Sequence, residues 1–186
     1  MILKGDSYAF IQRARITQKV GNYHCRRSKE NFKRTEILSI IRKYDIFLSH
    51  SYADKDLSLL LKKEIESIEA NVYKVYLDWY DDPELDRANV TQETAEHLRK
   101  VMRDCKCLFY ATSVNSKYSV WMPWECGYVD GLKGKVAICP ASKTQTQNSY
   151  KGQEYLGLYS YIDIFNGRLF VTNPSGTVVF SSWLSS

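Results

Sequence analysis

Residues 44–50 read YDIFLSH, a short apolar run that ends abruptly in a serine and a histidine. Strands of a parallel sheet are covered on both faces, so they appear in a sequence as continuous hydrophobic runs of this length. Asp54 is a candidate helix N-cap, and apolar residues then recur at helical spacing to about residue 69: Leu57, Leu60, Leu61, Ile65 and Ile68. The stretch therefore predicts a buried strand followed by a helix, the first half of a βαβ unit.

The same alternation continues along the chain. Further strands are predicted at 72–77, with Tyr73, Val75 and Leu77 on one face, at 107–112 and at 135–139. Helices are predicted from residue 90, with a stripe of Ala95, Leu98, Met102 and Cys105, and from about Pro123, which a first turn tolerates. Polar loops are expected at 78–89 and 141–152. Short β-like runs at 158–165, 168–171 and 177–180 are expected to add an edge strand or a hairpin. These elements predict an α/β fold, a central parallel sheet with helices on both faces.

Charge divides the chain into a basic N-terminal extension, residues 1–43, and an organised domain, residues 44–186. The extension holds eleven Lys or Arg against three Asp or Glu, a net charge of +8, whereas the remainder carries −3. Such an arm is compatible with nucleic acid, an anionic surface or another subunit, but its scattered charges favour a solvated leader. Within the domain, we expect a core at 44–140 and a β-rich tail at 150–186.

The five cysteines show no repeated spacing, which predicts reduced thiols and a cytoplasmic protein. Zinc binding at His24-Cys25 or Cys105-Lys106-Cys107 is disfavoured because neither pair has a C-x-x-C partner, so no metal is expected. The chain has no run of about 18 apolar residues, and its N-terminus lacks the apolar region of a secretory signal. We therefore expect no contact with a membrane.

In open α/β sheets, ligands bind beyond the carboxyl ends of the strands. This edge collects residues 49–51, the loop 78–89 and residues 112–125. The last of these leads into SVWMPWECGY, residues 119–128, where Glu125 lies close to Trp121 and Trp124. A carboxylate beside aromatic rings can stabilise the cationic sugar formed when a glycosidic bond breaks. The competing interpretation is an acid near a helix start, favoured by the helix dipole.

Several other chemistries are disfavoured. The chain has no P-loop motif and no G-x-G-x-x-G after its first strand. A serine nucleophile is disfavoured because no nucleophile elbow is present, and because Ser49 and His50, as neighbours on a strand, point to opposite sides.

Two motifs resemble those of TIR domains. Residues 44–56 resemble the opening strand and loop, which typically read YDVFISH followed by an acidic and polar turn. Ser119-x-Trp121-x-x-x-Glu125 matches the S-x-W-C-x-x-E pattern of NAD-cleaving TIR domains, with Met122 where many relatives carry Cys and Pro123 after it. The match is closer still to the TIR proteins of bacterial Thoeris antiphage systems, at residues 75–87, 90–95, 110–113 and 121–128. The resemblance covers roughly residues 44–140.

This resemblance implies a flavodoxin-like TIR fold and an enzyme that cleaves the nicotinamide–ribose bond of NAD+, which is a substrate and not a resident cofactor. The ADP-ribose would then close on itself to a cyclic signal for a separate effector. Glu125 is implied as the catalytic residue, and residues 78–89 as a loop that gates the site and joins neighbouring TIR domains. The residues expected to bind substrate are Ser49, His50, Asp78, Trp79, Ser119, Trp121 and Trp124. Core packing is also expected for at least one of the last two.

The implied partners are NAD+, further TIR domains on activation, the effector reached through the product, and a phage-derived trigger. Three alternatives remain at this stage. A non-catalytic TIR scaffold would act through assembly alone, and a deoxyribosyltransferase-like enzyme would use a carboxylate covalently. Nucleic-acid binding by residues 1–43 is the third and weakest.

Overall fold

The computed structural model describes residues 44–68, 72–85, 91–141 and 154–186, and the predictions for the basic extension and the 141–152 loop lie almost wholly outside these ranges. A seven-stranded sheet forms the middle layer, in the order β2-β1-β3-β4-β5-β6-β7. The strands are β1 (Ile46–Ser49), β2 (Val75–Tyr76), β3 (Cys107–Thr112), β4 (Val136–Pro140), β5 (Ser160–Phe165), β6 (Arg168–Asn173) and β7 (Gly176–Val179). The first five strands in this order are parallel to one another. Strand β6 pairs antiparallel with β5, and β7 pairs antiparallel with β6. The parallel part has the flavodoxin-like order 2-1-3-4-5.

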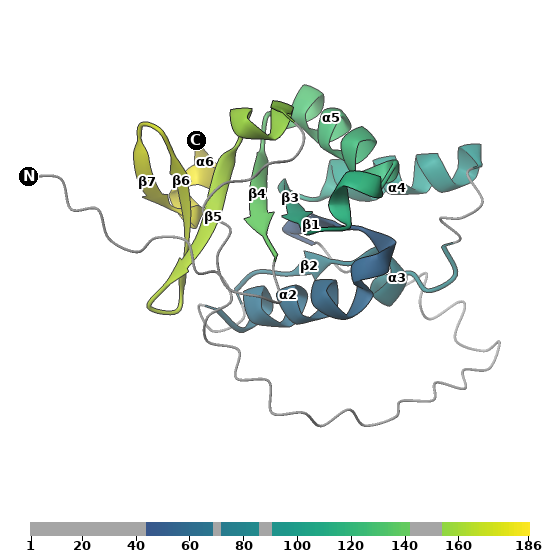
Figure 1. Ribbon diagram of the computed structural model, residues 1–186, viewed down its shortest axis with the longest axis horizontal. Coiled ribbons are helices and arrows are strands. Elements are labelled where there is room, and N and C mark those ends of the chain that lie inside the picture. The colour runs from purple at the N-terminus through teal and green to yellow at the C-terminus, as the bar shows by residue number, and fades with distance from the viewer. Residues whose placement is uncertain (1–43, 69–71, 86–90, 142–153) are drawn as a thin grey trace, which may run out of the picture.

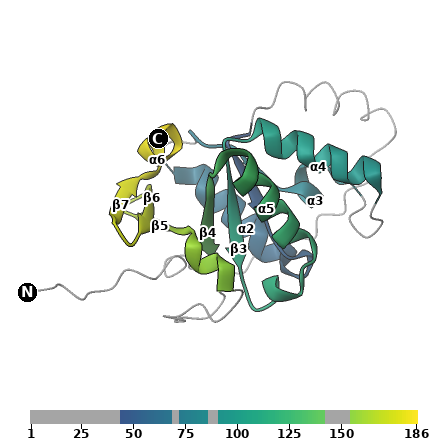
Figure 2. The same ribbon diagram turned by 90° about the horizontal axis from the view of Figure 1, so that it is seen from above.

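Helices cover both faces of this sheet, as the sequence predicts (Figure 1). They are α2 (Lys55–Ser67), α3 (Asp78–Asp81), α4 (Gln92–Asp104), α5 (Trp121–Lys133) and α6 (Phe180–Ser185). Helix α2 packs in one apolar core, which also takes in Phe180 of α6, and α4 and α5 pack in the other. Figure 2 shows α4 and α5 side by side. No helix in the described ranges is long and apolar enough to cross a membrane.

Alternation along β1 assigns its side chains to the two cores. Ile46 and Leu48 lie in the core beneath α2, whereas Phe47 lies in the core beneath α4 and α5. Because successive strand residues point to opposite faces, Ser49 is directed toward α5. This register brings a polar side chain under the helix that carries Glu125.

Local signals explain where several elements end. Helix α5 stops at Gly134, whose φ of 60° is the left-handed conformation that glycine adopts at low cost. The β5–β6 hairpin turns through Asn166 and Gly167, both with positive φ, as a two-residue turn requires. The β-like runs of the tail are thus confirmed as strands. They contribute β5, which pairs in parallel with β4, and two antiparallel hairpins, β5–β6 and β6–β7.

Three sequence-based expectations need correction. Strand β2 contains only two residues, although Tyr73, Val75 and Leu77 do share one core as predicted. The expected loop at 78–89 begins with helix α3, and residues 86–89 lie outside the described ranges. Helix α5 begins at Trp121, two residues before the expected start.

The α2 stripe also differs from the prediction. Asp54 occupies the N-cap position, but its side chain makes no capping hydrogen bond. Leu60 is 45% exposed, whereas Leu57, Leu61, Ile65 and Ile68 are buried. Leu60 therefore lies outside the core-facing stripe of the helix.

The neighbouring leucines of α2 provide a test of this packing. Replacement Leu61→Ala removes a side chain that is 2% exposed and should lower the free energy of unfolding by about 2–5 kcal/mol. Leu60→Ala, on the exposed side, should change it by only about 0.5 kcal/mol. Urea denaturation of the two variants measures both values, and equal losses would contradict the orientation of α2.

Candidate active site

The carboxylate of Glu125 is bound at the carboxyl end of β1. Ser49 Oγ donates a hydrogen bond to Glu125 Oε2 at 2.6 Å, and both residues are 0% exposed. A hydroxyl-to-carboxylate bond of this length is charge-assisted and stronger than a neutral one. Strand β1 and helix α5 are joined at this point by two residues that are 76 positions apart in sequence.

The position of Glu125 within α5 bears on one alternative. The helix begins at Trp121, so Glu125 is its fifth residue, and no acidic side chain lies in its first turn. A fully buried carboxylate one turn into a helix gains little from the dipole at the helix end. This position disfavours the interpretation of Glu125 as a helix-start acid, which stays a prediction.

His50 and Asp78 form a second buried pair at the same edge. His50 Nε2 lies 3.5 Å from Asp78 Oδ1, and the two side chains are 2% and 3% exposed. His50 Nδ1 lies 3.2 Å from the carbonyl oxygen of Leu48, which can only accept, so Nδ1 carries the proton of this bond. The pair joins the residue after β1 to the first residue of α3.

The other acids of the α3 segment bind partners on different elements. Asp81 lies 3.2 Å from Lys62 Nζ of α2; burial raises the pKa of Asp81, and the ammonium opposes this rise. Asp82 accepts a hydrogen bond from the Tyr76 hydroxyl at 2.7 Å and lies 2.9 Å from His97 Nε2 of α4. Burial acts to raise the pKa of Asp82, but the hydrogen bonds with His97 and Tyr76 outweigh it and lower the pKa. The segment is thus attached to β1, β2, α2 and α4.

Trp121 and Trp124 belong to an aromatic row on α5. Their ring centroids are 5.4 Å apart, edge to face, and Trp124 stacks on Tyr128 at 6.0 Å. Arg99 of α4 lies over the Trp124 ring at 5.4 Å, and Arg103 donates to the Tyr128 hydroxyl at 3.2 Å. The row packs against the core beneath α4 and α5 and fixes the rotation of the helix that carries Glu125.

Ser119 and Trp79 occupy separate positions. The Ser119 hydroxyl accepts a hydrogen bond from the Met122 N–H at 3.3 Å, in the first turn of α5. Trp79 Nε1 donates to Ser58 Oγ of α2 at 3.2 Å, and the indole packs against the α2 core. Trp79 therefore lies on the opposite face of the sheet from Glu125.

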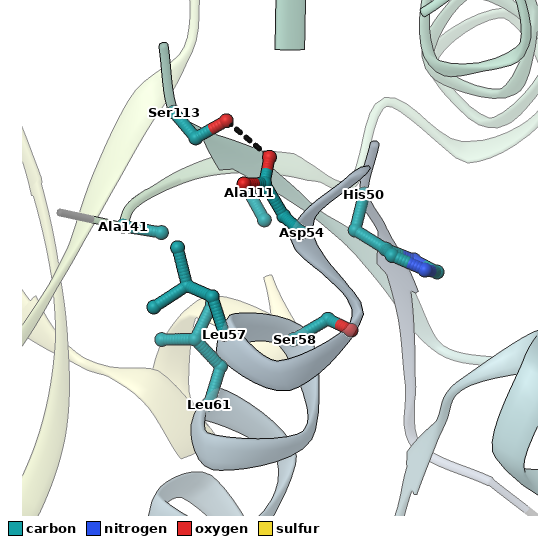
Figure 3. A pocket seen from close by; sticks show the side chains of 8 residues that line it. All are labelled: His50, Asp54, Leu57, Ser58, Leu61, Ala111, Ser113 and Ala141. Carbon is teal, nitrogen blue, oxygen red and sulfur yellow. Dashed lines mark hydrogen bonds between the residues drawn. The ribbon is translucent and has the colours of Figure 1, made fainter. Parts of the chain in front are cut away.

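A narrow pocket lies between α2 and the ends of β1, β3 and β4 (Figure 3). It has essentially no interior volume for a water molecule, and its lining residues are His50, Asp54, Leu57, Ser58, Leu61, Ala111, Ser113 and Ala141. Above it, Asp54 accepts hydrogen bonds from Ser113 Oγ at 2.5 Å and Asn115 Nδ2 at 2.7 Å. These bonds join the loops after β1 and β3 across the topological switch point of the sheet, where doubly wound folds bind ligands.

No family model matches the chain, but comparison with known proteins finds two relatives with similar names. The chain is 56% identical over 119 residues to the probable 3′ cyclic ADP-D-ribose synthase ThsB′ of Bacillus cereus (strain MSX-D12), covering 64% of this chain and 60% of that protein. It is 34% identical over 97 residues to the putative cyclic ADP-D-ribose synthase TIR2 of Cytobacillus dafuensis, covering 52% of this chain and 24% of that protein. Together with the strand order, these relatives support the resemblance to TIR domains.

Within the described domain, the predicted site residues fall into distinct groups. Ser49 contacts Glu125, His50 contacts Asp78, and Trp121 contacts Trp124. Ser49 and His50 point to opposite sides, as expected from their neighbouring positions. The substrate-binding roles of these residues stay predictions, as does the absence of a metal; among the described residues no cluster of three or more His, Cys, Asp or Glu could hold an ion.

The sequence did not predict the hydrogen bonds that Asp54 accepts from Ser113 and Asn115, because Asp54 was assigned to helix capping. The available signal was the pair of small polar segments, 49–51 and 112–113, that end two strands of the same sheet. Strands adjacent in a parallel sheet end at one edge, so an acid in one loop and hydroxyl or amide donors in the other are placed to meet.

The Ser49–Glu125 bond leads to a stability prediction. Ser49→Ala deprives a fully buried carboxylate of a donor and should lower the free energy of unfolding by roughly 1–3 kcal/mol. The control is Ser67→Ala, because the Ser67 hydroxyl donates to an exposed carbonyl of α2; its effect should stay within about 0.5 kcal/mol. Chemical denaturation at neutral pH measures both, and matching values would show that Ser49 does not support the buried carboxylate.

Proposed function

We propose that this TIR domain cleaves the nicotinamide–ribose bond of NAD+ and closes the ADP-ribose into a cyclic signal. The observation that carries the proposal is the buried Ser49–Glu125 hydrogen bond at the carboxyl edge of the sheet. The names of the two relatives, both cyclic ADP-D-ribose synthases, support the same reaction. The chain spans 60% of the length of the first relative and 24% of the second, so the activity of the whole protein is part of the proposal.

Glu125 is proposed as the catalytic residue. When the bond from ribose to nicotinamide breaks, the sugar develops positive charge, and an oriented carboxylate stabilises it. Ser49 is a positioning residue in this scheme, because its hydrogen bond selects the orientation of the carboxylate before substrate binds. The cation is then captured by a hydroxyl or ring nitrogen of the same ADP-ribose, which loses a proton when it carries one, and the molecule closes.

The remaining site residues are proposed to shape the nucleotide pocket. They are His50, Asp78, Trp79, Ser119, Trp121 and Trp124. All lie in or beside segments at the carboxyl edge of the sheet or in the first turn of α5. Ring faces suit the flat adenine and nicotinamide, and the buried pair formed by His50 and Asp78 suits ribose hydroxyls.

The proposed setting is antiphage defence in the bacterial cytoplasm. The cyclic product would activate a separate effector, and a phage-derived trigger together with association of TIR domains would start synthesis. The four described cysteines, Cys105, Cys107, Cys126 and Cys139, are free and buried, which supports a reducing compartment.

The single chain is proposed to be a resting form. Ser49 and Glu125 have no exposed surface, so NAD+ can reach the carboxylate only after neighbouring segments or subunits move. An enzyme that consumed NAD+ continuously would harm its own cell. Closure of the site therefore fits a protein that is switched on by infection.

The first functional prediction concerns Glu125→Gln. This change keeps the size of the side chain and removes its charge, so NAD+ cleavage should fall by at least about 100-fold. The matched control is Glu64→Gln on the exposed side of α2, which should retain wild-type turnover. Cells expressing each protein are challenged with a panel of phages, and NAD+, nicotinamide and ADP-ribose isomers are measured by mass spectrometry.

A cyclic ADP-ribose mass in wild type and Glu64→Gln, but not in Glu125→Gln, would support the proposal. Equal behaviour of all three proteins, with NAD+ intact even after forced assembly at high concentration, would favour the scaffold. A trapped glycosyl-enzyme would instead favour the covalent, deoxyribosyltransferase-like route.

The resting form makes a separate prediction about concentration. Dilute purified protein should show almost no NAD+ cleavage, and turnover per molecule should rise steeply as the protein is concentrated or crowded. Initial rates measured across a dilution series, with light scattering on the same samples, provide the test. Robust and concentration-independent turnover by a monomer would contradict the resting form.

A further inference from the structure

The ammonium of Lys55 lies against two aromatic rings from different elements. Its Nζ is 3.9 Å from the Tyr52 ring centroid and 5.3 Å from the Trp79 ring centroid. Both distances are within the range of about 6 Å in which a ring face attracts a cation. Tyr52 comes from the 3₁₀ turn after β1 and Trp79 from α3. We name the space between these two rings the aromatic slot.

Lys55 holds this position against its local preference. It is the first residue of α2, where the helix dipole favours acidic side chains and disfavours a cation. A residue that violates a local rule without compensation from its own element often marks a functional position. The compensation for Lys55 comes from the two rings.

The two contacts of Lys55 set an upper limit on the distance between the rings, and this limit is compatible with a flat ring between them. The two distances from Lys55 place the ring centroids no more than about 9 Å apart. A ring stacked between two others needs about 7–8 Å, since carbon atoms in contact lie about 3.5–4.0 Å apart. The hydrogen bond from Trp79 Nε1 to Ser58 fixes the indole against α2, and Tyr52 is 68% exposed, so the slot is open to solvent on one side.

The slot lies at the same edge of the sheet as the candidate active site. Trp79 follows Asp78, which contacts His50, and His50 follows Ser49, the partner of Glu125. Because Trp79 packs on the α2 face and Glu125 lies on the α5 face, the slot is separate from the buried carboxylate. A ligand can therefore reach the slot while the carboxylate stays closed.

We propose that the aromatic slot is an outer subsite for a flat cationic ring and that Lys55 fills it in the absence of ligand. The identity of the ring rests on the proposed function: the nicotinamide of NAD+ is flat and positively charged. The reduced dinucleotide carries a neutral, puckered ring and gains no cation–π attraction. The slot thereby selects the oxidised form before the site opens, and Lys55 competes with it as an internal cation.

The test uses small probes and needs no turnover. N1-methylnicotinamide, a flat cation, and nicotinamide, its neutral counterpart, are titrated into the full chain and followed by ligand-observed NMR. The cation should bind at least about threefold more tightly than the neutral ring. Lys55→Gln should tighten binding of the cation by about 2- to 10-fold, because the internal competitor is gone. Lys63→Gln, an exposed lysine of the same helix, should leave it unchanged.

Tyr52→Leu should abolish the preference for the cation, and Trp79→Leu should do the same where thermal unfolding shows that the variant is folded. Equal binding of the two probes, or a Lys55→Gln protein that binds the cation no more tightly than Lys63→Gln, overturns the proposal. The result is independent of the Glu125→Gln experiment: slot binding without any NAD+ cleavage would overturn the proposed function alone, and cleavage without slot binding would overturn the subsite alone.

Discussion

A carboxyl group withdrawn from water needs hydrogen bonds in place of its hydration, and the domain is arranged so that Ser49 meets Glu125. The alternation of β1 directs Ser49 to the α5 face, and the aromatic row with Arg99 sets the rotation of α5. A one-residue slip in the strand would turn the hydroxyl to the other core. The parallel register and the helix packing are thus both needed to form this one buried hydrogen bond.

The acidic segment that follows β2 provides the second constraint on this edge. Asp78, Asp81 and Asp82 each engage a different basic side chain: His50, Lys62 and His97. The side chains of Asp78 and Asp81 are each 3% exposed and that of Asp82 is 21% exposed, so the loss of one base removes a contact from a mostly buried carboxylate. The segment therefore acts as a brace between α2, β1 and α4. Any opening of the neighbouring site that moves α3 has to break several of these contacts together.

The sequence predicted the parts of the fold that depend on local pattern. Continuous apolar runs identified β3 at its observed residues, and small polar residues marked the edge where the candidate site lies. Helix α3 was missed because its four residues have no apolar periodicity and are held by partners distant in sequence. The resemblance to TIR domains singled out Glu125 but not the bond with Ser49. The aromatic slot depends on Trp79 lying against a lysine 24 residues earlier, a contact that no local pattern encodes.

Burial of Glu125, the proposed catalytic residue, has a quantitative consequence for substrate binding. When only a fraction of molecules is open, the apparent affinity equals the affinity of the open form multiplied by that fraction. An open population of about 1% therefore weakens binding roughly 100-fold. Contacts that must break together, such as those of Asp78, Asp81 and Asp82, favour the closed form without any change to Glu125 or Ser49. A second copy of the chain that binds only the open form would restore the full affinity, because it shifts the population and does not alter the chemistry. The proposed resting form therefore needs no change in the proposed catalytic residue, only a small open population.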